Sequence, residues 1–190
     1  ELERLSQRDS LIDLYNKTAF RERVMQNLPT TVLNGKTHAL LFLDLDNFKA
    51  LNDSLGHIVG DNALAEAADA LKRIFRNADA VGRFGGDEFC VFAIGITRNA
   101  ITARAESVLQ ALSMHFEHDG KAVDITASIG IYVFDGSETS YEEALQKADN
   151  AQYRAKQLGK NRYVFHDDPL TAEELAAAQQ RGDGLGGFGF

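Results

Sequence analysis

The sequence predicts an α+β domain of the ferredoxin-like, or palm, type, in which a central antiparallel-containing sheet is flanked by helices. Runs with strand and helix patterns follow one another in the order β-α-α-β-β-α-β-α-β, a split β-α-β arrangement with additions. Two of the strand-like runs are joined by a tight Gly-Gly turn, so they are expected to pair antiparallel. The 190 residues, 44% of them hydrophobic, suffice for one globular domain.

The first residues predict helices that precede the sheet. Leu2 and Leu5 continue a helical spacing, which predicts an N-terminal linker helix and a chain cut from a longer protein. The next helix is expected to start after Asn16, whose side chain suits an N-cap, and to turn Phe20 and Val24 toward the core.

Residues 38–45 form a short apolar run that predicts a central strand. The run ends in Asp44-Leu45-Asp46. Open α/β sheets commonly bind ligands at the carboxyl ends of their strands. The two carboxylates therefore mark a candidate ligand site at this edge of the sheet.

Two helices are expected after this strand. A short one begins near Phe48 and stops at Gly56, and a longer one begins near Asp61. The longer helix carries one apolar stripe, made of Leu64, Ala67, Leu71 and Phe75. Both helices are expected to pack on the sheet.

A hairpin follows, with strands at residues 81–84 and 89–94. They are separated by Gly85-Gly86-Asp87-Glu88, whose glycines tolerate positive φ and whose acids lie at the tip. The rest is predicted as helix, strand, helix and strand over residues 101–115, 123–133, 141–158 and 162–165.

The character of the chain changes after Asp168. Residues 171–180 favour a helix, whereas residues 181–190 contain five glycines and predict a flexible tail. We therefore expect a domain over residues 1–166 and a partly flexible C-terminal tail over 167–190.

Composition excludes several classes of protein. With 20 basic and 28 acidic side chains the formal net charge is −8, which argues against non-specific nucleic-acid binding. Apolar runs such as residues 39–43 are far shorter than the roughly 20 residues that span a bilayer. The single cysteine, Cys90, cannot form an internal disulfide, so we expect a cytoplasmic location.

Several motifs occur at the ends of the predicted elements. They are Asp44-Leu45-Asp46-Asn47-Phe48-Lys49, then Asn52-Asp53, and Gly85-Gly86-Asp87-Glu88-Phe89 on the hairpin. Together they resemble the GGDEF family of diguanylate cyclases, over about residues 9–165. The resemblance implies a nucleotidyl-cyclase-like palm.

Strand-end and hairpin-tip carboxylates can converge on one hard cation such as Mg²⁺, or Mn²⁺. The resemblance places metal on Asp44, on the Leu45 carbonyl and on Asp87, and makes Asp87 a candidate general base. Glu88 is adjacent and could share either role. Lys49, one turn from the strand, joins Asp87 and Glu88 as a catalytic candidate. A solvated acidic turn is the alternative reading.

A triphosphate bound to an acidic protein also needs fixed cations. Lys156 and Lys160 lie four residues apart near a helix end, within Ala155-Lys156-Gln157-Leu158-Gly159-Lys160-Asn161-Arg162. By resemblance these two lysines contact the terminal phosphates, Lys160 standing where Arg is frequent, so charge is kept without bidentate recognition. Arg83 is a further candidate. Lysines that favour a helix dipole are the alternative.

Guanine recognition needs polar groups that match the edge of the base. The resemblance assigns this work to Asn52 and Asp61, adds His57 on the substrate side, and includes Asn47 and Phe48 in the substrate site. The alternatives are helix caps for Asn52 and Asp61 and a surface histidine for His57.

Arg76-Asn77-Ala78-Asp79 matches the family's RxxD product-inhibition site. The resemblance implies that Arg76 and Asp79 bind the cyclic product. The alternative is that Arg76 caps a helix and Asp79 opens a turn. A second arginine completes the site in some members; alignment places Ser107 there, with Arg104 nearby as a substitute.

The family's opening motif is altered here. It occurs as Asp9-Ser10-Leu11-Ile12-Asp13-Leu14-Tyr15-Asn16-Lys17, with Ile12, Asp13 and Lys17 in place of the usual Thr, Gly and Arg. These changes affect an entry turn rather than the predicted metal site.

The resemblance implies condensation of two GTP into cyclic di-GMP and two pyrophosphates, with the product as a feedback inhibitor. One domain offers one guanine pocket, so a homodimer is expected to be active, under an N-terminal sensor or dimerising domain missing from this fragment. The whole could be the cytoplasmic part of a membrane-bound sensor. The alternatives are an inactive GGDEF-like receptor for GTP or cyclic di-GMP, and another nucleotidyl cyclase or polymerase palm that uses ATP.

Overall fold

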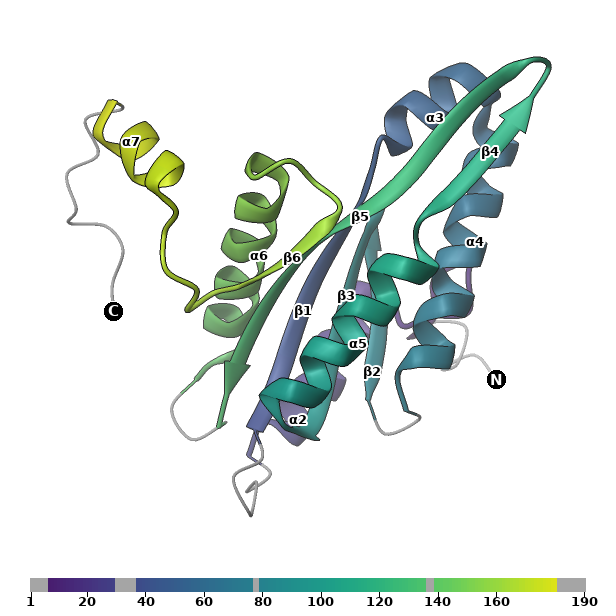
Figure 1. The fold of residues 1–190 in the computed structure, drawn as a ribbon. Coiled ribbons are helices and arrows are strands. Elements are labelled where there is room, and N and C mark those ends of the chain that lie inside the picture. The colour runs from purple at the N-terminus through teal and green to yellow at the C-terminus, as the bar shows by residue number, and fades with distance from the viewer. Residues whose placement is uncertain (1–6, 30–36, 77–78, 136–138, 181–190) are drawn as a thin grey trace.

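The computed structural model describes residues 7–29, 37–76, 79–135 and 139–180, and it has the predicted α+β fold (Figure 1). The strands are β1 (Thr37–Asp46), β2 (Ala80–Gly85), β3 (Glu88–Ile96), β4 (Met114–His118), β5 (Lys121–Phe134) and β6 (Arg162–Phe165). The helices are α2 (Lys17–Asn27), α3 (Phe48–Leu55), α4 (His57–Ile74), α5 (Arg98–Ala111), α6 (Tyr141–Gln157) and α7 (Ala172–Gln180). The predicted helix near Leu2 and the glycine-rich tail lie outside the described residues.

One sheet forms the centre of the molecule. Its strands follow the order β2-β3-β1-β5-β4, and β6 also pairs with β5. All pairs are antiparallel except β5–β6, which is parallel. Because β1 lies between β3 and β5, its carboxyl end meets the β2–β3 hairpin on one side and β5 on the other.

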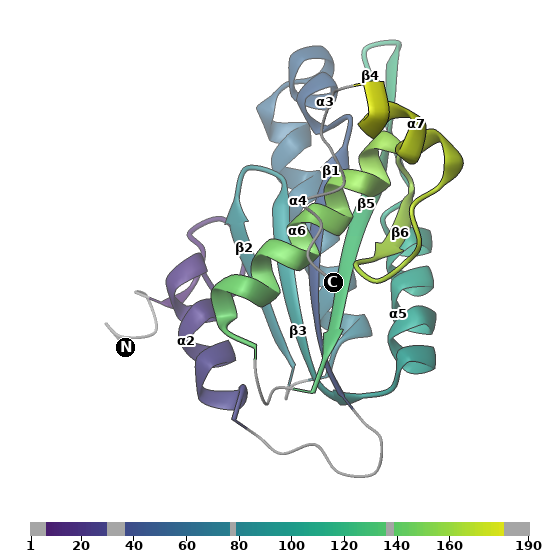
Figure 2. The ribbon, with the colours of Figure 1, turned by 90° about the vertical axis from the view of Figure 1, so that its left-hand side faces the viewer.

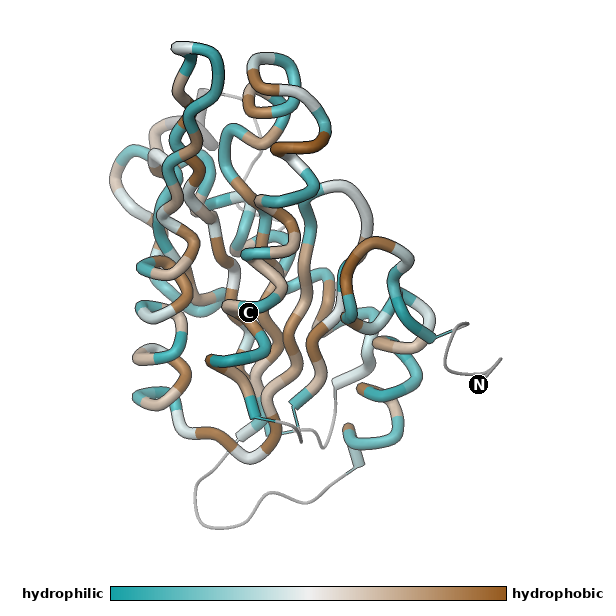
Figure 3. The backbone as a smooth tube through the Cα atoms, turned by 90° about the vertical axis from the view of Figure 1, so that its right-hand side faces the viewer, coloured by the Kyte–Doolittle hydropathy of each residue, from teal (hydrophilic) through white to brown (hydrophobic). Residues whose placement is uncertain are grey.

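Helices cover both faces of this sheet. Helix α6 lies across one face beside α2, and α3, α4 and α5 lie on the other (Figures 1 and 2). The alternation of side chains along a strand divides β1 between two cores. Leu41, Leu43 and Leu45 join the core beneath α3, α4 and α5, whereas Leu40 and Phe42 join the core beneath α2 and α6. Figure 3 shows hydrophobic residues concentrated along the central strands.

Local signals account for several boundaries. The side chain of Asn16 accepts a hydrogen bond from the Ala19 amide at 2.9 Å, which confirms the predicted N-cap of α2. The β2–β3 turn uses Gly85 and Gly86 at φ 141° and 49°, the conformations for which glycine was expected. Helix α3 ends at Gly56 as predicted.

Two predicted helix boundaries are wrong. Helix α4 begins at His57 instead of Asp61, because Gly56, at φ 90°, ends α3 and starts α4 in one sharp turn. The helix expected over residues 101–115 spans Arg98–Ala111, and the following residues form the additional strand β4. Its apolar residues alternate, with Met114 and Phe116 partly buried, and an Asp119-Gly120 turn at positive φ joins it to β5.

Helix α7 lies close to the predicted helix at 171–180 and is tied to α6. The guanidinium of Arg154 donates to both carboxylate oxygens of Glu174, at 2.7 and 3.2 Å, and to two carbonyls in the preceding segment. No helix among the described residues has the length and apolarity needed to cross a bilayer.

Candidate functional site

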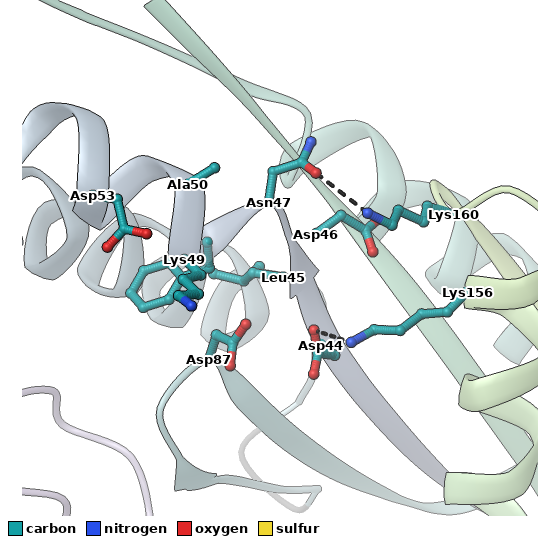
Figure 4. Close-up of a pocket in the computed structure, with 11 residues that line it drawn as sticks. Asp44, Leu45, Asp46, Asn47, Lys49, Ala50, Asp53, Asp87, Lys156 and Lys160 are labelled. Carbon is teal, nitrogen blue, oxygen red and sulfur yellow. Dashed lines mark hydrogen bonds and ion pairs between the residues drawn. The ribbon is translucent and has the colours of Figure 1, made fainter.

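The β2–β3 hairpin brings its acidic tip against the carboxyl end of β1. Glu88 is the cross-strand partner of Asp44, and the Leu45 amide donates to the Asp87 carbonyl at 3.2 Å. A pocket of about 480 Å³ opens at this point (Figure 4). Its lining consists of Asp44, Leu45, Asp46, Asn47, Phe48, Lys49, Ala50, Asp53, Asp87, Lys156 and Lys160. The fold therefore brings together most of the predicted metal and phosphate residues.

Burial and neighbouring carboxylates raise the pKa of two acids at the hairpin tip, Asp87 and Glu88. Burial and the neighbouring Asp44 raise the pKa of Asp87 to about 6. The same two causes raise the pKa of Glu88, and Asp149 on α6 adds to that effect. The Nζ of Lys156 lies 2.7 Å from Asp44 and offsets part of the negative charge. Lys156 alone therefore does not neutralise the carboxylates around it.

Asp149 is a member of this group that the sequence reasoning missed. Burial and Asp44 raise its pKa, and Lys156 lowers it. The signal was present, because Asp149 and Lys156 are seven residues apart on α6 and so lie on one helical face. Its contribution is electrostatic, since it does not line the pocket.

The donor set suits a hard divalent cation. Asp44 and Asp87 supply carboxylate oxygens and Leu45 lines the same pocket, which is the ligand chemistry that Mg²⁺ prefers. The like-charge crowding at Asp87 is what a bound cation would relieve. Among the described residues no three His, Cys, Asp or Glu side chains are already arranged around a metal position. Glu88 lies beside Asp44 but outside the pocket lining, so its share in metal binding stays a prediction.

Three lysines face the same space from different elements. Lys49 comes from α3, Lys156 from the last turn of α6, and Lys160 from the turn that follows α6. The Nζ of Lys160 donates to the side-chain oxygen of Asn47 at 3.3 Å (Figure 4). Lys156 lies in the last turn of α6, where a lysine also interacts favourably with the helix dipole. The phosphate-binding and helix-dipole interpretations of this residue are therefore compatible.

Arg83 does not take part in the pocket. Its guanidinium donates twice to the Gly86 carbonyl, at 2.8 and 3.0 Å, and once to Asp9 at 3.0 Å. Asp9 in turn accepts from the Leu11 and Ile12 amides, so the altered opening motif still forms a defined turn. Arg83 therefore supports the hairpin, and the structure does not bring it into the lining of the pocket where its part in phosphate binding was predicted.

The predicted guanine residues lie on α3 and α4, outside the lining of this pocket. Neither Asn52 nor Asp61 caps a helix, since both lie inside one, and Asp61 and His57 are exposed. The side-chain oxygen of Asn52 is buried with no hydrogen-bond partner among the described residues. A Cβ at Gly60 would overlap that oxygen, so glycine at position 60 lets α3 and α4 approach each other here.

The sequence of this chain was compared with models of known protein families. The model of the family described as diguanylate cyclase, GGDEF domain, matches residues 6–162. This chain belongs to the GGDEF family.

Two curated relatives and one crystal structure illustrate the match. The cyclic di-GMP phosphodiesterase NbdA of Pseudomonas aeruginosa is 37% identical over 178 residues, which make up 94% of this GGDEF chain and 23% of NbdA. Diguanylate cyclase A of Treponema denticola is 34% identical over 166 residues, which make up 85% and 45% of the two chains. Both relatives are bacterial, and this chain spans less than half the length of each.

The crystal structure is that of the diguanylate cyclase SiaD in complex with its activator SiaC, from Pseudomonas aeruginosa. It superposes on this GGDEF domain with a TM-score of 0.76 at 32% identity and covers 86% of this chain and 63% of that chain. The fold predicted from the sequence is therefore also the fold of a solved family member.

The predicted product-inhibition residues of the GGDEF domain form a second cluster. The Asp79 side chain is completely buried and accepts from the Arg76 and Ile94 amides, each at 3.1 Å, and from Arg104 at 2.8 Å. Arg76 is 55% exposed and donates to the Ile94 carbonyl. Ser107 takes no part, because its hydroxyl donates to Ala103 within α5.

In the second cluster, two residues are held by contacts inside the protein and one is exposed. Asp79 is held by three donors inside the protein, and Arg104 is held by Asp79 and by the Phe75 ring, 5.5 Å away. Arg76 alone presents an exposed guanidinium among the three. Asn77 and Ala78, between the two motif residues, lie outside the described residues.

Proposed function

We propose that this domain is a diguanylate cyclase that condenses two molecules of GTP into cyclic di-GMP and two pyrophosphates. The observation that carries the proposal is the convergence of Asp44 and Asp87 with three lysines around one pocket. Family membership and the named diguanylate cyclases among the relatives support the same activity.

Mg²⁺, or Mn²⁺, would be held by Asp44, the Leu45 carbonyl and Asp87, with Glu88 beside them. Such an ion supplies charge stabilisation for the triphosphate and the departing pyrophosphate. Lys156 is paired with Asp44 at 2.7 Å. We infer that Lys156 exchanges this ion pair for the terminal phosphates, with Lys160 and Lys49 adding fixed positive charge.

In the proposed reaction the 3′-hydroxyl of one nucleotide attacks the α-phosphorus of the other, and the phosphorus–oxygen bond to pyrophosphate breaks. Asp87 is the candidate base for the hydroxyl proton. Asn52, Asp61 and His57 are proposed to hold guanine at the α3–α4 corner, with Asn47 and Phe48 lining the substrate side.

One domain provides one such set, so the proposal requires two copies that face each other around a two-fold axis. The domain is proposed to cover residues 1–166, with 167–190 as a tail, and to act in the cytoplasm, where GTP is supplied. The chain spans less than half the length of NbdA and of diguanylate cyclase A, so both relatives contain further regions. We propose that this protein has one too, a sensor or dimerising region before residue 1.

The test is to incubate the protein with GTP and Mg²⁺ and to separate the nucleotides. Cyclic di-GMP is expected, and its rate of formation should rise more steeply than linearly with protein concentration, because the active site forms from two copies. An absence of product at high protein concentration would refute the proposal.

A non-catalytic receptor for GTP or cyclic di-GMP is the second candidate. The specific observation behind it is NbdA, which is named a cyclic di-GMP phosphodiesterase although it contains a stretch 37% identical to this chain. Calorimetry that detects nucleotide binding without turnover would favour the receptor. Product from ATP in place of GTP would instead indicate another nucleotidyl cyclase.

A further inference from the structure

Asp46, the second carboxylate of the strand-end pair, is used differently from Asp44. Its side chain is buried, with 2% exposure. One oxygen accepts from the Ser128 hydroxyl at 2.7 Å, and the other accepts from the Thr126 hydroxyl at 2.7 Å and from the Asn161 amide at 3.1 Å. Both oxygens therefore have donors from the protein itself.

The turn that receives the third bond has an unfavourable backbone conformation. Gly159, Lys160 and Asn161 follow α6 with φ of 111°, 62° and 46°. Each of the two non-glycine residues costs roughly 1 kcal/mol in the left-handed region, so surrounding contacts must hold them there. The Lys160 amide is satisfied by the Ala155 carbonyl at 3.1 Å. The Asn161 amide depends on Asp46.

Lys160 is thus held from both ends by consecutive residues of the β1 terminus. Asp46 binds the backbone on the C-terminal side of Lys160, and Asn47 accepts from its Nζ at 3.3 Å. The exposed Lys160 side chain consequently points toward Asn47 at the pocket (Figure 4).

We propose that Asp46 is a positioning residue, outside the metal set, that holds the 159–161 turn so that Lys160 faces the nucleotide triphosphate. The inference rests on the proposed function, which supplies the triphosphate. It assigns different tasks to the two acids of one motif: Asp44 faces the cation and Asp46 orients a lysine.

The chemistry of the three donors defines the informative variants. Asp46→Ala leaves two hydroxyls and an amide without their acceptor. Asp46→Asn can keep its oxygen toward Thr126 and Asn161 while its NH₂ group donates to the Ser128 hydroxyl, which also accepts. The asparagine variant should therefore rescue much of what alanine loses. Asp46→Ser is too short to reach the Asn161 amide but leaves room for a water, and it replaces the alanine variant if that fails to fold.

The experiment measures binding of a GTP analogue with a methylene group between the α and β phosphorus atoms, by calorimetry with Mg²⁺ on the full chain. Asp46→Ala and Lys160→Ala are each expected to weaken binding about tenfold, the scale of one charge-assisted contact. The double variant should bind no more weakly than the weaker single variant, because both remove the same contact. Asp46→Asn should stay within about threefold of wild type.

Asp168→Ala is the matched control. Asp168 also accepts from a backbone amide, that of Phe165 at the end of β6, at 2.8 Å, but it does not line the pocket. The loss of Asp168 should lower the stability of the protein without weakening its binding of the GTP analogue.

The inference would be overturned if Asp46→Ala bound the analogue with wild-type affinity. It would also be overturned if the loss of affinity in the double variant equalled the product of the losses in the two single variants. A wild type that binds the analogue but makes no cyclic di-GMP would refute the proposed activity alone. A wild type that does not bind the analogue would overturn both.

Discussion

The pocket at the end of β1 and the Arg76–Asp79–Arg104 cluster contain the same kinds of residue in opposite electrostatic states. At the pocket, Asp87 and two carboxylates outside its lining, Glu88 and Asp149, have raised pKa values, and Lys156 is paired with Asp44. In the cluster, a single buried carboxylate has two arginines and two backbone amides around it.

This difference separates a site prepared for a ligand from one completed by the protein. Crowded carboxylates store repulsion that a cation or a proton relieves, so they favour binding at the expense of stability. A buried carboxylate with a full set of donors stabilises the fold, and removing it leaves its partners unpaired. Within the second cluster, therefore, only the exposed Arg76 is available to a ligand.

The largest expected effect tests the pocket. Asp87→Asn should lower cyclic di-GMP formation about a thousandfold, because it removes the candidate base and a metal ligand. It should not lower the free energy of unfolding, since the repulsion with Asp44 disappears. Nucleotide assays and urea unfolding measure the two quantities. Glu66→Gln, at an exposed position on α4, is the control, and substantial turnover in Asp87→Asn would contradict the assignment.

The second prediction concerns the buried partner in the cluster. Asp79→Ala should lower the free energy of unfolding by about 3 kcal/mol, because Arg104 and two amides lose a buried acceptor. Urea unfolding measures the change. Asp69→Ala, which breaks a surface pair with Lys72 at 3.0 Å, should cost less than about 1 kcal/mol. Equal losses in the two variants would remove the distinction drawn between the regions.

The third prediction separates Arg76 from Asp79. Arg76→Ala should weaken cyclic di-GMP binding about tenfold, which is the scale of a lost contact to a charged group. It should change the free energy of unfolding by less than about 1 kcal/mol, since its ion pair is largely exposed. Calorimetry with cyclic di-GMP measures the affinity, with the exposed neighbour Arg73→Ala as control. Unchanged affinity would show that the cluster is purely structural.

The smallest effect is a pH dependence of the metal-free protein. The folded pKa of Asp87 is about 6 and its ordinary value is 3.8, so between these values the folded state binds more protons than the unfolded chain. The free energy of unfolding should therefore fall as pH rises from about 4 to about 6, by roughly 1 kcal/mol after solvent screening. Urea unfolding in a chelator measures it. Asp87→Asn should flatten the curve, and a rise over this range in wild type that depends on Asp87 would contradict the assignment.

Much of the fold could be predicted because its signals are local. The N-cap at Asn16, the glycines of the hairpin and the stripe on α4 each depend on residues a few positions apart. The failures also have local causes. Strand β4 is only five residues long and is separated from α5 by two residues, and the start of α4 depends on the conformation of Gly56.

The sequence predicted most of the residues that make up the candidate site, but not what each of them does there. The motifs named Asp44, Asp87, Lys156 and Lys160, and the fold places all four around one pocket. They did not include Asp149, which shares no motif with the strand-end acids and approaches them only because α6 crosses the sheet.

The sequence by itself determined the order of elements, the glycine turn and the set of acids and lysines, since periodicity and motif spacing are properties of neighbouring residues. Only the tertiary structure decided which acids remain free to bind a ligand. Asp46 is satisfied by donors 80 to 115 residues away and Asp79 by one 25 residues away, whereas Asp87 has a like charge beside it. Whether a carboxylate is neutralised depends on the donors that folding brings to it, and those donors lie far along the chain.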